Sequence, residues 1–415
     1  KAFKTALHNE NKPFAIIAKT KKGKGLTLLE DQLNWHGKAL KKEELDIAIK
    51  ELDDLDITLT GKLSTPAIPT EVEESLSLSE NPTYVGDASA TLSMTEYKKG
   101  ELIATRKAYG NALANIGKVN SDIIVLDAET KNSTFSETFE KAFPDRFFEM
   151  FIAEQNMVGV ATGLSRRNKI PFISTFTAFF TRAFDQIRMS QYSEANIKYV
   201  GSHAGVSIGE DGSSQMGLED LSMFSSLLNS VVLYPSDAVS TEKLVATSAE
   251  HQGVVYIRTT RMETPVLYDV EEDFPIGGSK TLKSSDKDIV TLIAAGVTLH
   301  ESLKAYDQLK AENIFVRVID LYSIKPIDYL TLEKAINETN AIITVEDHYP
   351  HGGIGSAVSQ ALSSIRNAKP IYMLAVTKLP KSGKPEELLE FEEISANAIV
   401  KKVKEVVMNH VSKKD

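Results

Sequence analysis

FEMFIAEQNMVGVATGLSR, residues 148–166, is the stretch from which the rest of the sequence can be interpreted. The apolar run at residues 147–153 has the length of a buried strand and is rich in aromatic side chains. Asn156 can cap a helix, and residues 157–164 continue as an apolar helix of small residues. Glu154 is therefore expected where a strand ends and a helix begins, a place where open α/β sheets bind ligands. A carboxylate buried there needs a partner or becomes protonated, and spacing alone favours the simpler alternative of an acid exposed on a loop.

Composition limits the class of protein. The chain has 415 residues, enough for two or three domains, and its net charge of −10 argues against nucleic acid or an anionic membrane as partner. It has no cysteine, which excludes disulfides, thiolate nucleophiles and cysteine metal sites. It has neither an apolar run of membrane-spanning length nor a signal-peptide pattern, so we expect a cytoplasmic protein. The sequence starts abruptly, without methionine, as a fragment of a longer protein would.

Four segments differ in composition. Residues 1–53 form a leading piece with a predicted strand at residues 14–18 and a basic, glycine-punctuated turn. One strand cannot stand alone, so this piece belongs to a larger domain. Residues 54–99 are dominated by Ser, Thr, Pro and Glu and predict an interdomain linker. Residues 100–275 and 276–415 predict two further domains.

Helices and strands alternate through both of these domains, which is typical of a mostly parallel α/β sheet. Predicted strands of the first domain cover residues 123–126, 147–153, 172–175, 197–201, 231–234 and 254–258, with helices at 107–116 and 134–142 between them. Predicted strands of the second cover residues 289–295, 315–321, 341–345 and 371–375, with helices at 299–312, 329–337, 356–365 and 396–411. We therefore predict an α/β fold with a smaller C-terminal α/β domain.

Two stretches of the first domain have the composition of a binding site. GSHAGVSIGEDGSSQ, residues 201–215, follows a strand and includes His203, Asp211 and Gln215; polar loops at such places often build sites. FISTFTAFFTRAF, residues 172–184, contains five phenylalanines, which are either core or an aromatic wall for a planar ring.

Other features are weaker when taken singly. Arg106, Ser133, Arg258 and Arg261 lie near element ends and can bind phosphate, yet each is also typical of an ordinary surface. The GIG at residues 353–355 lacks the third glycine of a dinucleotide fingerprint and indicates a tight turn.

Taken together, the motifs of this chain resemble those of a transketolase. They are IIAKTKKGKG (16–25), WHGK (35–38), ATRKAYG (104–110), KNSTFSE (131–137), FIAEQNM (151–157), STFTAFFTRAFDQIR (174–188), GSHAGVSIGEDGSSQM (201–216), YIRTTR (256–261) and VEDHYPHGGIG (345–355). They occur in family order and span nearly the whole chain, which makes the set more specific than any one motif. Gln215 stands where other branches tend to carry histidine, which makes the pattern of motifs most similar to that of the animal-type branch.

The resemblance implies a thiamine diphosphate enzyme that moves a two-carbon ketol unit between sugar phosphates of the pentose phosphate pathway. It assigns Glu154 to the pyrimidine ring, where a glutamate sets the tautomer that takes the proton from the thiazolium carbon. Phe179 would stack on the pyrimidine with Phe176 nearby, and Gln215 would face its amino side. Lys22 and His36 would reach the cofactor and the substrate, and His36 can also shuttle protons.

The resemblance also implies a substrate site. Arg106, Ser133 and Arg261 match the family's phosphate grip, while His203 and Asp211 match residues that bind sugar hydroxyls. Nearest among other enzymes are a deoxyxylulose phosphate synthase and the decarboxylating subunit of a 2-oxoacid dehydrogenase, which share the glutamate but not the full phosphate grip. A non-catalytic scaffold that kept the fold is the alternative of a different class.

One departure from the family is informative. The family holds the diphosphate and its magnesium or calcium ion through a GDG motif and an asparagine some thirty residues on, and this chain has neither. We therefore expect no metal ligands here and a missing diphosphate-binding domain. Either a companion polypeptide supplies that domain or the chain is a truncated piece. Sites in this family form between subunits, so we expect a homodimer, or a heterotetramer if the enzyme is split.

Overall fold

The computed structural model describes residue 5 and residues 16–21, 23–32, 40–52, 94–366 and 368–411, which fall into two compact units divided at residue 78. The smaller unit contains helix α2 (Lys42–Glu51), which has acidic residues in its first turn and Lys50 in its last, as its dipole favours. Of the strand predicted at residues 14–18, the described part is irregular. Lys22, His36 and the predicted linker up to residue 93 lie outside the described residues.

A seven-stranded sheet lies at the centre of the larger unit, in the order β12-β6-β7-β5-β4-β2-β3. Its strands are β2 (Ile123–Asp127), β3 (Phe147–Glu149), β4 (Ile170–Phe176), β5 (Lys198–Ser202), β6 (Val231–Leu233), β7 (Val255–Arg258) and β12 (Ser323–Lys325). All neighbours pair in parallel except β12, which is antiparallel to β6. Strands β2, β5 and β7 are buried at every position, as expected for a parallel sheet covered on both faces.

Alternation along the strands divides the core into two layers. Ile123 and Val125 pack with helices α3 (Thr105–Val119) and α9 (Ala238–Glu250) on one face. Ile124 and Leu126 pack on the other face with α6 (Glu154–Ser165), α7 (Phe184–Tyr192) and α8 (Asp220–Ser225). The period of two along each strand therefore determines which of its residues face each layer of helices.

Three predicted elements are wrong in their bounds. The strand expected at residues 147–153 ends at Glu149, because Phe151 has a φ of +55° and lies exposed with Ile152. The helix that follows starts at Glu154, earlier than the cap expected at Asn156. The helix expected at residues 134–142 is divided into α4 (Lys131–Thr134) and α5 (Glu137–Ala142), because Phe135 adopts a left-handed conformation with a φ of +63°.

The C-terminal part contains a five-stranded sheet in the order β14-β13-β10-β11-β9. Its strands are β9 (Lys280–Lys283), β10 (Val290–Ala294), β11 (Val316–Asp320), β13 (Ala341–Val345) and β14 (Ile371–Leu374), of which only β9 is antiparallel to its neighbour. Its helices are α10 (Val297–Ala311), α11 (Tyr329–Glu338), α12 (Ile354–Leu362), α13 (Pro385–Phe391) and α14 (Ala396–Val411). The predicted α/β fold class with a second, smaller α/β sheet is confirmed.

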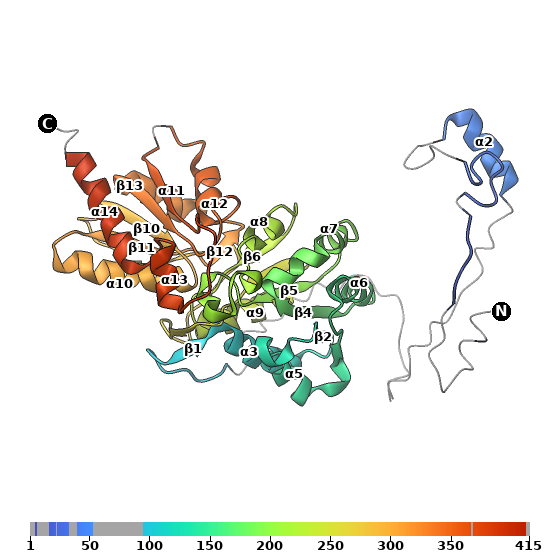
Figure 1. Cartoon of the computed structure of the whole chain (residues 1–415), viewed down its shortest axis with the longest axis horizontal. Helices are drawn as coiled ribbons and strands as arrows, with labels where there is room; N and C mark the ends of the chain where they lie inside the picture. Colours follow the sequence, from blue (N-terminus) through green and yellow to red (C-terminus); the bar gives the residue numbers. More distant parts are fainter. Residues whose placement is uncertain are drawn as a thin grey trace. The chain divides into compact units, whose positions relative to one another are not determined.

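The two sheets of the larger unit are joined through shared core. Figure 1 shows β12, from the C-terminal part of the chain, beside β6 of the seven-stranded sheet. One hydrophobic cluster includes Leu126 and Val158 of the first part and also Ile293 and Ile342 of the second. A small antiparallel ribbon pairs β1 (Leu102–Ala104), near the start of the first part, with β8 (Glu263–Pro265), near its end.

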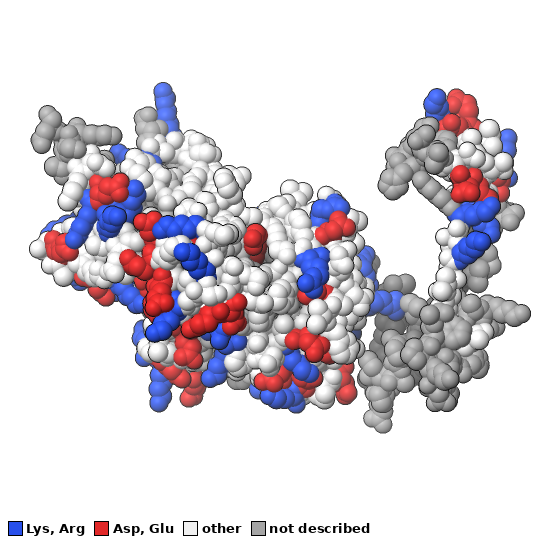
Figure 2. All heavy atoms as spheres, in the orientation of Figure 1, with Lys and Arg blue, Asp and Glu red and all other residues white. Residues whose placement is uncertain are grey.

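The surface of the larger unit carries both signs of charge. On the face shown in Figure 2, acidic and basic side chains are intermingled over both parts of this unit. Among the described residues, no helix combines the length and apolarity that crossing a membrane requires.

Candidate active site

The predicted site residues lie where the parallel strands of the seven-stranded sheet end. Because β2, β4, β5 and β7 run in parallel, the segments that follow them emerge at one edge of the sheet. Ser133 follows β2, Phe176 ends β4, His203 follows β5 and Arg261 follows β7. Arg106 joins this edge from the first turn of α3.

Glu154 is the first residue of α6 and its side chain is only 2% exposed. The Arg182 guanidinium donates through Nη1 to both carboxylate oxygens, at 2.9 and 3.1 Å. Arg182 belongs to the short helix η3 (Thr177–Ala183), and its side chain is 55% exposed. A carboxylate at the start of a helix also meets the positive end of the helix dipole. The structure therefore places Glu154 as a buried, paired carboxylate and not as the exposed loop acid that spacing alone favoured.

Three rings form a stack that includes Phe179 of η3. Phe176 and Phe179 lie nearly parallel, with ring centroids 5.2 Å apart and an interplanar angle of 10°. His203 stacks on Phe176 with a centroid separation of 3.8 Å. Both phenylalanines are half-buried, so the stack presents an aromatic wall at the edge of the sheet.

Arginines surround the histidine at the end of this stack. Arg106 Nη1 donates to the Ser133 carbonyl oxygen at 2.7 Å and lies 3.4 Å from His203 Nε2. Arg106 Nε is a buried donor without a hydrogen-bond partner among the described residues. Burial lowers the pKa of Arg106, and the positive charge of Arg261 lowers this pKa further. An oxyanion at this position would supply the missing acceptor and offset the repulsion between the two guanidinium groups.

Arg261 connects the cluster to the loop after β5. Its Nη1 forms an ion pair with Asp211 at 2.9 Å and donates to the Ile208 carbonyl oxygen at 3.3 Å. His203 has a φ of +60°, and its Nδ1 lies 2.8 Å from Ser202 Oγ. Burial, with added repulsion from Arg106 and Arg261, lowers the pKa of His203 to about 3. The imidazole is therefore neutral at physiological pH and can donate or accept one hydrogen bond at Nε2.

Not every predicted residue is brought into this cluster by a direct contact. Gln215 is half-buried in η5 (Ser213–Gln215), which packs against η3. Ser133 contributes its carbonyl to Arg106. Glu154 reaches the aromatic stack through η3, which carries both its partner Arg182 and Phe179.

Sequence reasoning missed two residues of this region. Arg182 stands within the quoted motif STFTAFFTRAFDQIR, but nothing in the spacing pairs it with Glu154. Asp127, at the end of β2, accepts hydrogen bonds from the Thr130 backbone and from three hydroxyls, and burial raises its pKa to about 6. An acid that ends a predicted buried strand was the available signal for it.

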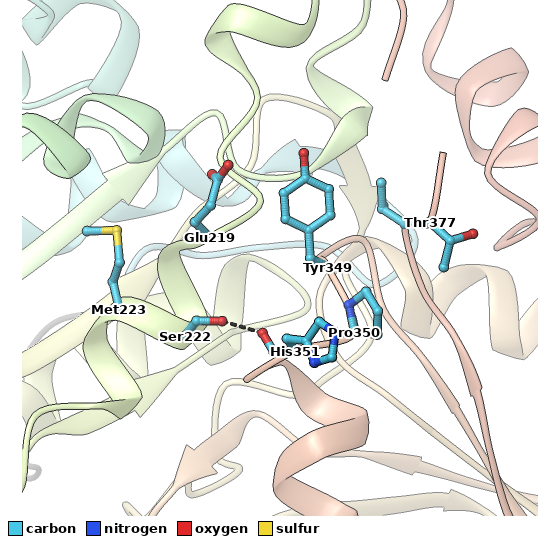
Figure 3. A pocket seen from close by; sticks show the side chains of 8 residues that line it. Glu219, Ser222, Met223, Tyr349, Pro350, His351 and Thr377 are labelled. Carbon is cyan, nitrogen blue, oxygen red and sulfur yellow. Dashed lines mark hydrogen bonds between the residues drawn. The ribbon is translucent and has the colours of Figure 1, made fainter. Parts of the chain in front are cut away.

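A separate hollow lies between α8 and the segment after β13 (Figure 3), with a volume of about 560 Å³. It is lined by Glu219, Ser222, Met223, Tyr349, Pro350, His351, Val376 and Thr377. In Figure 3 the Ser222 hydroxyl points toward His351, to whose carbonyl oxygen it donates. The hollow contains none of the predicted site residues.

The described residues can also be compared with the ligand sets that metal ions require. Over the residues that the structure describes, no group of three or more His, Asp or Glu side chains is arranged to hold a metal ion.

Comparisons with known proteins identify the family. The family model of the transketolase pyrimidine-binding domain matches residues 101–266, and that of the transketolase C-terminal domain matches residues 279–399. The chain belongs to the transketolase family. It is similar to mouse transketolase-like protein 2, with 51% identity over 409 residues that cover 98% of this chain and 64% of the relative. Human transketolase is 49% identical over 410 residues, 98% of this chain and 63% of its own length. The chain thus spans less than two thirds of both transketolase relatives.

Solved transketolase structures have the same fold. A structure described as a split gene transketolase, an inactive beta4 tetramer, matches with a TM-score of 0.66 and 41% identity, covering 73% of this chain and 97% of that one. Transketolase from Campylobacter jejuni matches with a TM-score of 0.65 at 20% identity, over 76% of this chain and 48% of that one, which supports the fold alone. The predicted resemblance to transketolases is confirmed.

Proposed function

We propose that this chain is the pyrimidine-binding and C-terminal portion of a transketolase, which transfers a two-carbon ketol unit from a ketose phosphate to an aldose phosphate. The buried, arginine-paired carboxylate of Glu154 beside the Phe176–Phe179 wall is the observation that carries this proposal. In this scheme residues 100–275 and 276–415 are the two domains, and residues 54–99 link them to the preceding tail.

The residues present fit the pyrimidine side of thiamine diphosphate. An aromatic wall offers a planar ring a stacking surface, and a buried carboxylate offers its ring nitrogen a strong hydrogen bond. Glu154 would hold that nitrogen, Phe179 and Phe176 would bind the ring face, and Gln215 would lie on the amino side. When bound, the cofactor supplies the carbon nucleophile and the electron sink. The described residues offer no metal cluster, so the ligands of a magnesium or calcium ion would come from the diphosphate-binding half.

The cation cluster fits a sugar phosphate. Arg106 and Arg261 would bind the phosphate together with Ser133, because guanidinium groups match phosphate oxygens bidentately. Neutral His203 and Asp211 would bind sugar hydroxyls, and a site that pairs each hydroxyl discriminates strongly against analogues that lack it. Lys22 and His36 remain predicted cofactor and substrate contacts.

The proposal for assembly starts from the relatives, of whose length this chain spans less than two thirds. The similar structure described as a split gene transketolase is described as an inactive beta4 tetramer, and 97% of that chain is covered here. We propose that activity needs the diphosphate-binding half, supplied by a companion chain in a heterotetramer or by a preceding N-terminal domain of the same polypeptide in a homodimer. Intact mass spectrometry of the native sample separates these two arrangements.

The decisive test is Glu154→Gln in the assembled enzyme. Glutamine is nearly isosteric but cannot carry the charge, so ketol transfer from xylulose phosphate should fall by about 100-fold or more with the fold retained. Glu137→Gln, which alters a surface pair with Lys141, should keep wild-type activity. Retained activity in Glu154→Gln contradicts the mechanism. Turnover of pyruvate in place of xylulose phosphate supports the other thiamine enzymes, and an inactive wild-type assembly supports the scaffold.

A further inference from the structure

Both segments that carry the candidate substrate grip are packed against the C-terminal domain. In the loop after β5, His203, Asp211 and Gln215 belong to the predicted site. The apolar residues of the same loop join the hydrophobic core of the five-stranded sheet. These are Val206, Ile208, Met216 and Leu218, in one cluster with Leu292, Val345 and Leu389. The loop after β5 is therefore packed directly against the C-terminal domain.

One carboxylate of that domain reaches the second segment as well. Asp347 follows β13 and is fully buried. Its Oδ1 accepts from Arg258 Nη1 at 2.7 Å and from Tyr234 Oη at 3.0 Å. Arg258 ends β7, three residues before Arg261, and its Nη2 also donates to the Gly217 carbonyl oxygen at 3.0 Å.

The same carboxylate lies directly against the loop after β5. Gly205 has a φ of +75°, and a Cβ at that position would lie 1.8 Å from Asp347 Oδ2. The close approach occurs two residues after His203. A single C-terminal side chain thus contacts the backbone beside His203 and the guanidinium that ends the strand leading to Arg261.

We propose that Asp347 is a positioning residue that holds the His203 loop and the Arg261 segment in the spacing the sugar phosphate requires. The proposal rests on the proposed function for the identity of the ligand, whereas the positioning itself is a property of the fold. It assigns the C-terminal domain a part in substrate binding, although none of its residues belongs to the predicted site.

The chain provides a matched control for a purely structural role. Asp320, at the end of β11, is also fully buried and also reaches across to the first domain. It accepts from Ser236 Oγ at 2.9 Å and from Tyr268 Oη at 2.6 Å. These partners lie outside both site segments. Asp320→Asn therefore weakens the junction between the domains without touching either segment.

Hydrogen–deuterium exchange on the full chain tests the positioning directly. In Asp347→Asn the backbone amides of residues 204–217 and 259–262 should exchange at least about tenfold faster than in the wild type. In Asp320→Asn they should keep wild-type rates. Equal rates in both variants, or an increase spread evenly over the chain, overturn the proposal. Tyr234→Phe removes one hydrogen bond to Asp347 and leaves the Arg258 pair, so it serves if Asp347→Asn does not fold; the same two segments should then exchange faster to a smaller degree.

Kinetics of the assembled enzyme tests the consequence for the ligand. Asp347→Asn should raise KM for the ketose phosphate about tenfold with a smaller change in kcat, because a looser grip weakens binding more than chemistry. Asp320→Asn should leave both constants unchanged. Equal KM values in the two variants overturn the proposed link to substrate. An inactive wild-type assembly contradicts the proposed function, and the exchange measurement then decides the positioning on its own.

Discussion

At the scale of single residues, the candidate site depends on how buried charges are compensated. Among the described residues, Glu154 is paired with one cation, Arg182. The Arg182 side chain is half in solvent, so a ligand donor can replace it without leaving a second charge buried. Arg106 has a buried Nε for which the described residues offer no acceptor. These two residues offer a carboxylate and a donor to molecules that enter the site.

His203 gives a prediction for pH. Its pKa is about 3 in the folded chain and about 6.5 in an unfolded one, so only the unfolded state takes up a proton between these values. The stability that the folded chain owes to a neutral His203 is therefore complete above pH 6.5 and is lost as the pH falls toward 3. Between pH 7 and pH 5 this costs the wild type about 2 kcal/mol of unfolding free energy, which His203→Gln should not lose.

Denaturant unfolding at the two pH values measures the difference between the variants. His351→Gln is the control, because His351 is exposed and its loss should leave the wild-type pH dependence in place. An unchanged pH dependence in His203→Gln would contradict a neutral, buried His203.

At the scale of elements, Asp127 holds the turn that carries Ser133. Its two oxygens accept from Thr130, Thr134 and Ser136 at 2.6–2.9 Å. Asp127→Ala leaves these donors unpaired in a buried place and should lower the unfolding free energy by about 3 kcal/mol. Asp127→Asn keeps one acceptor oxygen and should cost less than half as much. Chemical denaturation of both variants checks the order, and equal losses would contradict it.

In helix α6 we expect a substitution that raises the unfolding free energy, whereas Asp127→Ala lowers it. A Cβ at Gly159 would meet no atom within 4 Å, so Gly159→Ala should raise the unfolding free energy of the isolated chain by about 0.5–1 kcal/mol. In α3 a Cβ at Gly110 would lie 2.5 Å from the Phe135 carbonyl oxygen, so the same substitution there should destabilise the chain. Thermal unfolding of the pair checks the signs, and stabilisation by both would contradict the packing described for α3.

Most elements of the larger unit could be predicted from the sequence, because buried parallel strands have continuous apolar runs. The strand at residues 341–345 and the helix at residues 396–411 have the predicted bounds. Predictions failed where a single backbone angle decides the course of the chain, as at Phe135 and Phe151. Both have a positive φ, which phenylalanine does not favour and which the sequence therefore does not indicate. The pairing of Glu154 with Arg182 depends on tertiary contacts, which no local pattern contains. Glu154 was singled out by its position between a strand and a helix, and its role, which the motif implies, stays a prediction.

At the scale of the whole molecule, apolar side chains beside Glu154 remain uncovered. Phe151 is 65% exposed and Ile152 is 73% exposed, immediately before α6. We expect the diphosphate-binding half to cover them. Ile152→Asp should therefore abolish assembly with that half and leave the melting temperature of the isolated chain unchanged. Sedimentation measures the assembly.

The control for this prediction is Leu330→Asp, which alters a leucine of α11 that is 76% exposed. It should assemble as the wild type does. Normal assembly of Ile152→Asp would place the contact surface elsewhere.

Strand β12 has a consequence for synthesis on the ribosome. It completes the seven-stranded sheet, yet it begins only at Ser323, long after β7 ends at Arg258. Until that segment emerges, β6 of the nascent chain is an unpaired apolar edge, which is a template for association between chains. A polypeptide that stops at residue 275 keeps this edge permanently. We therefore expect the nascent chain to be most prone to association over this interval, and the pyrimidine-binding domain without its successor to be prone to aggregation.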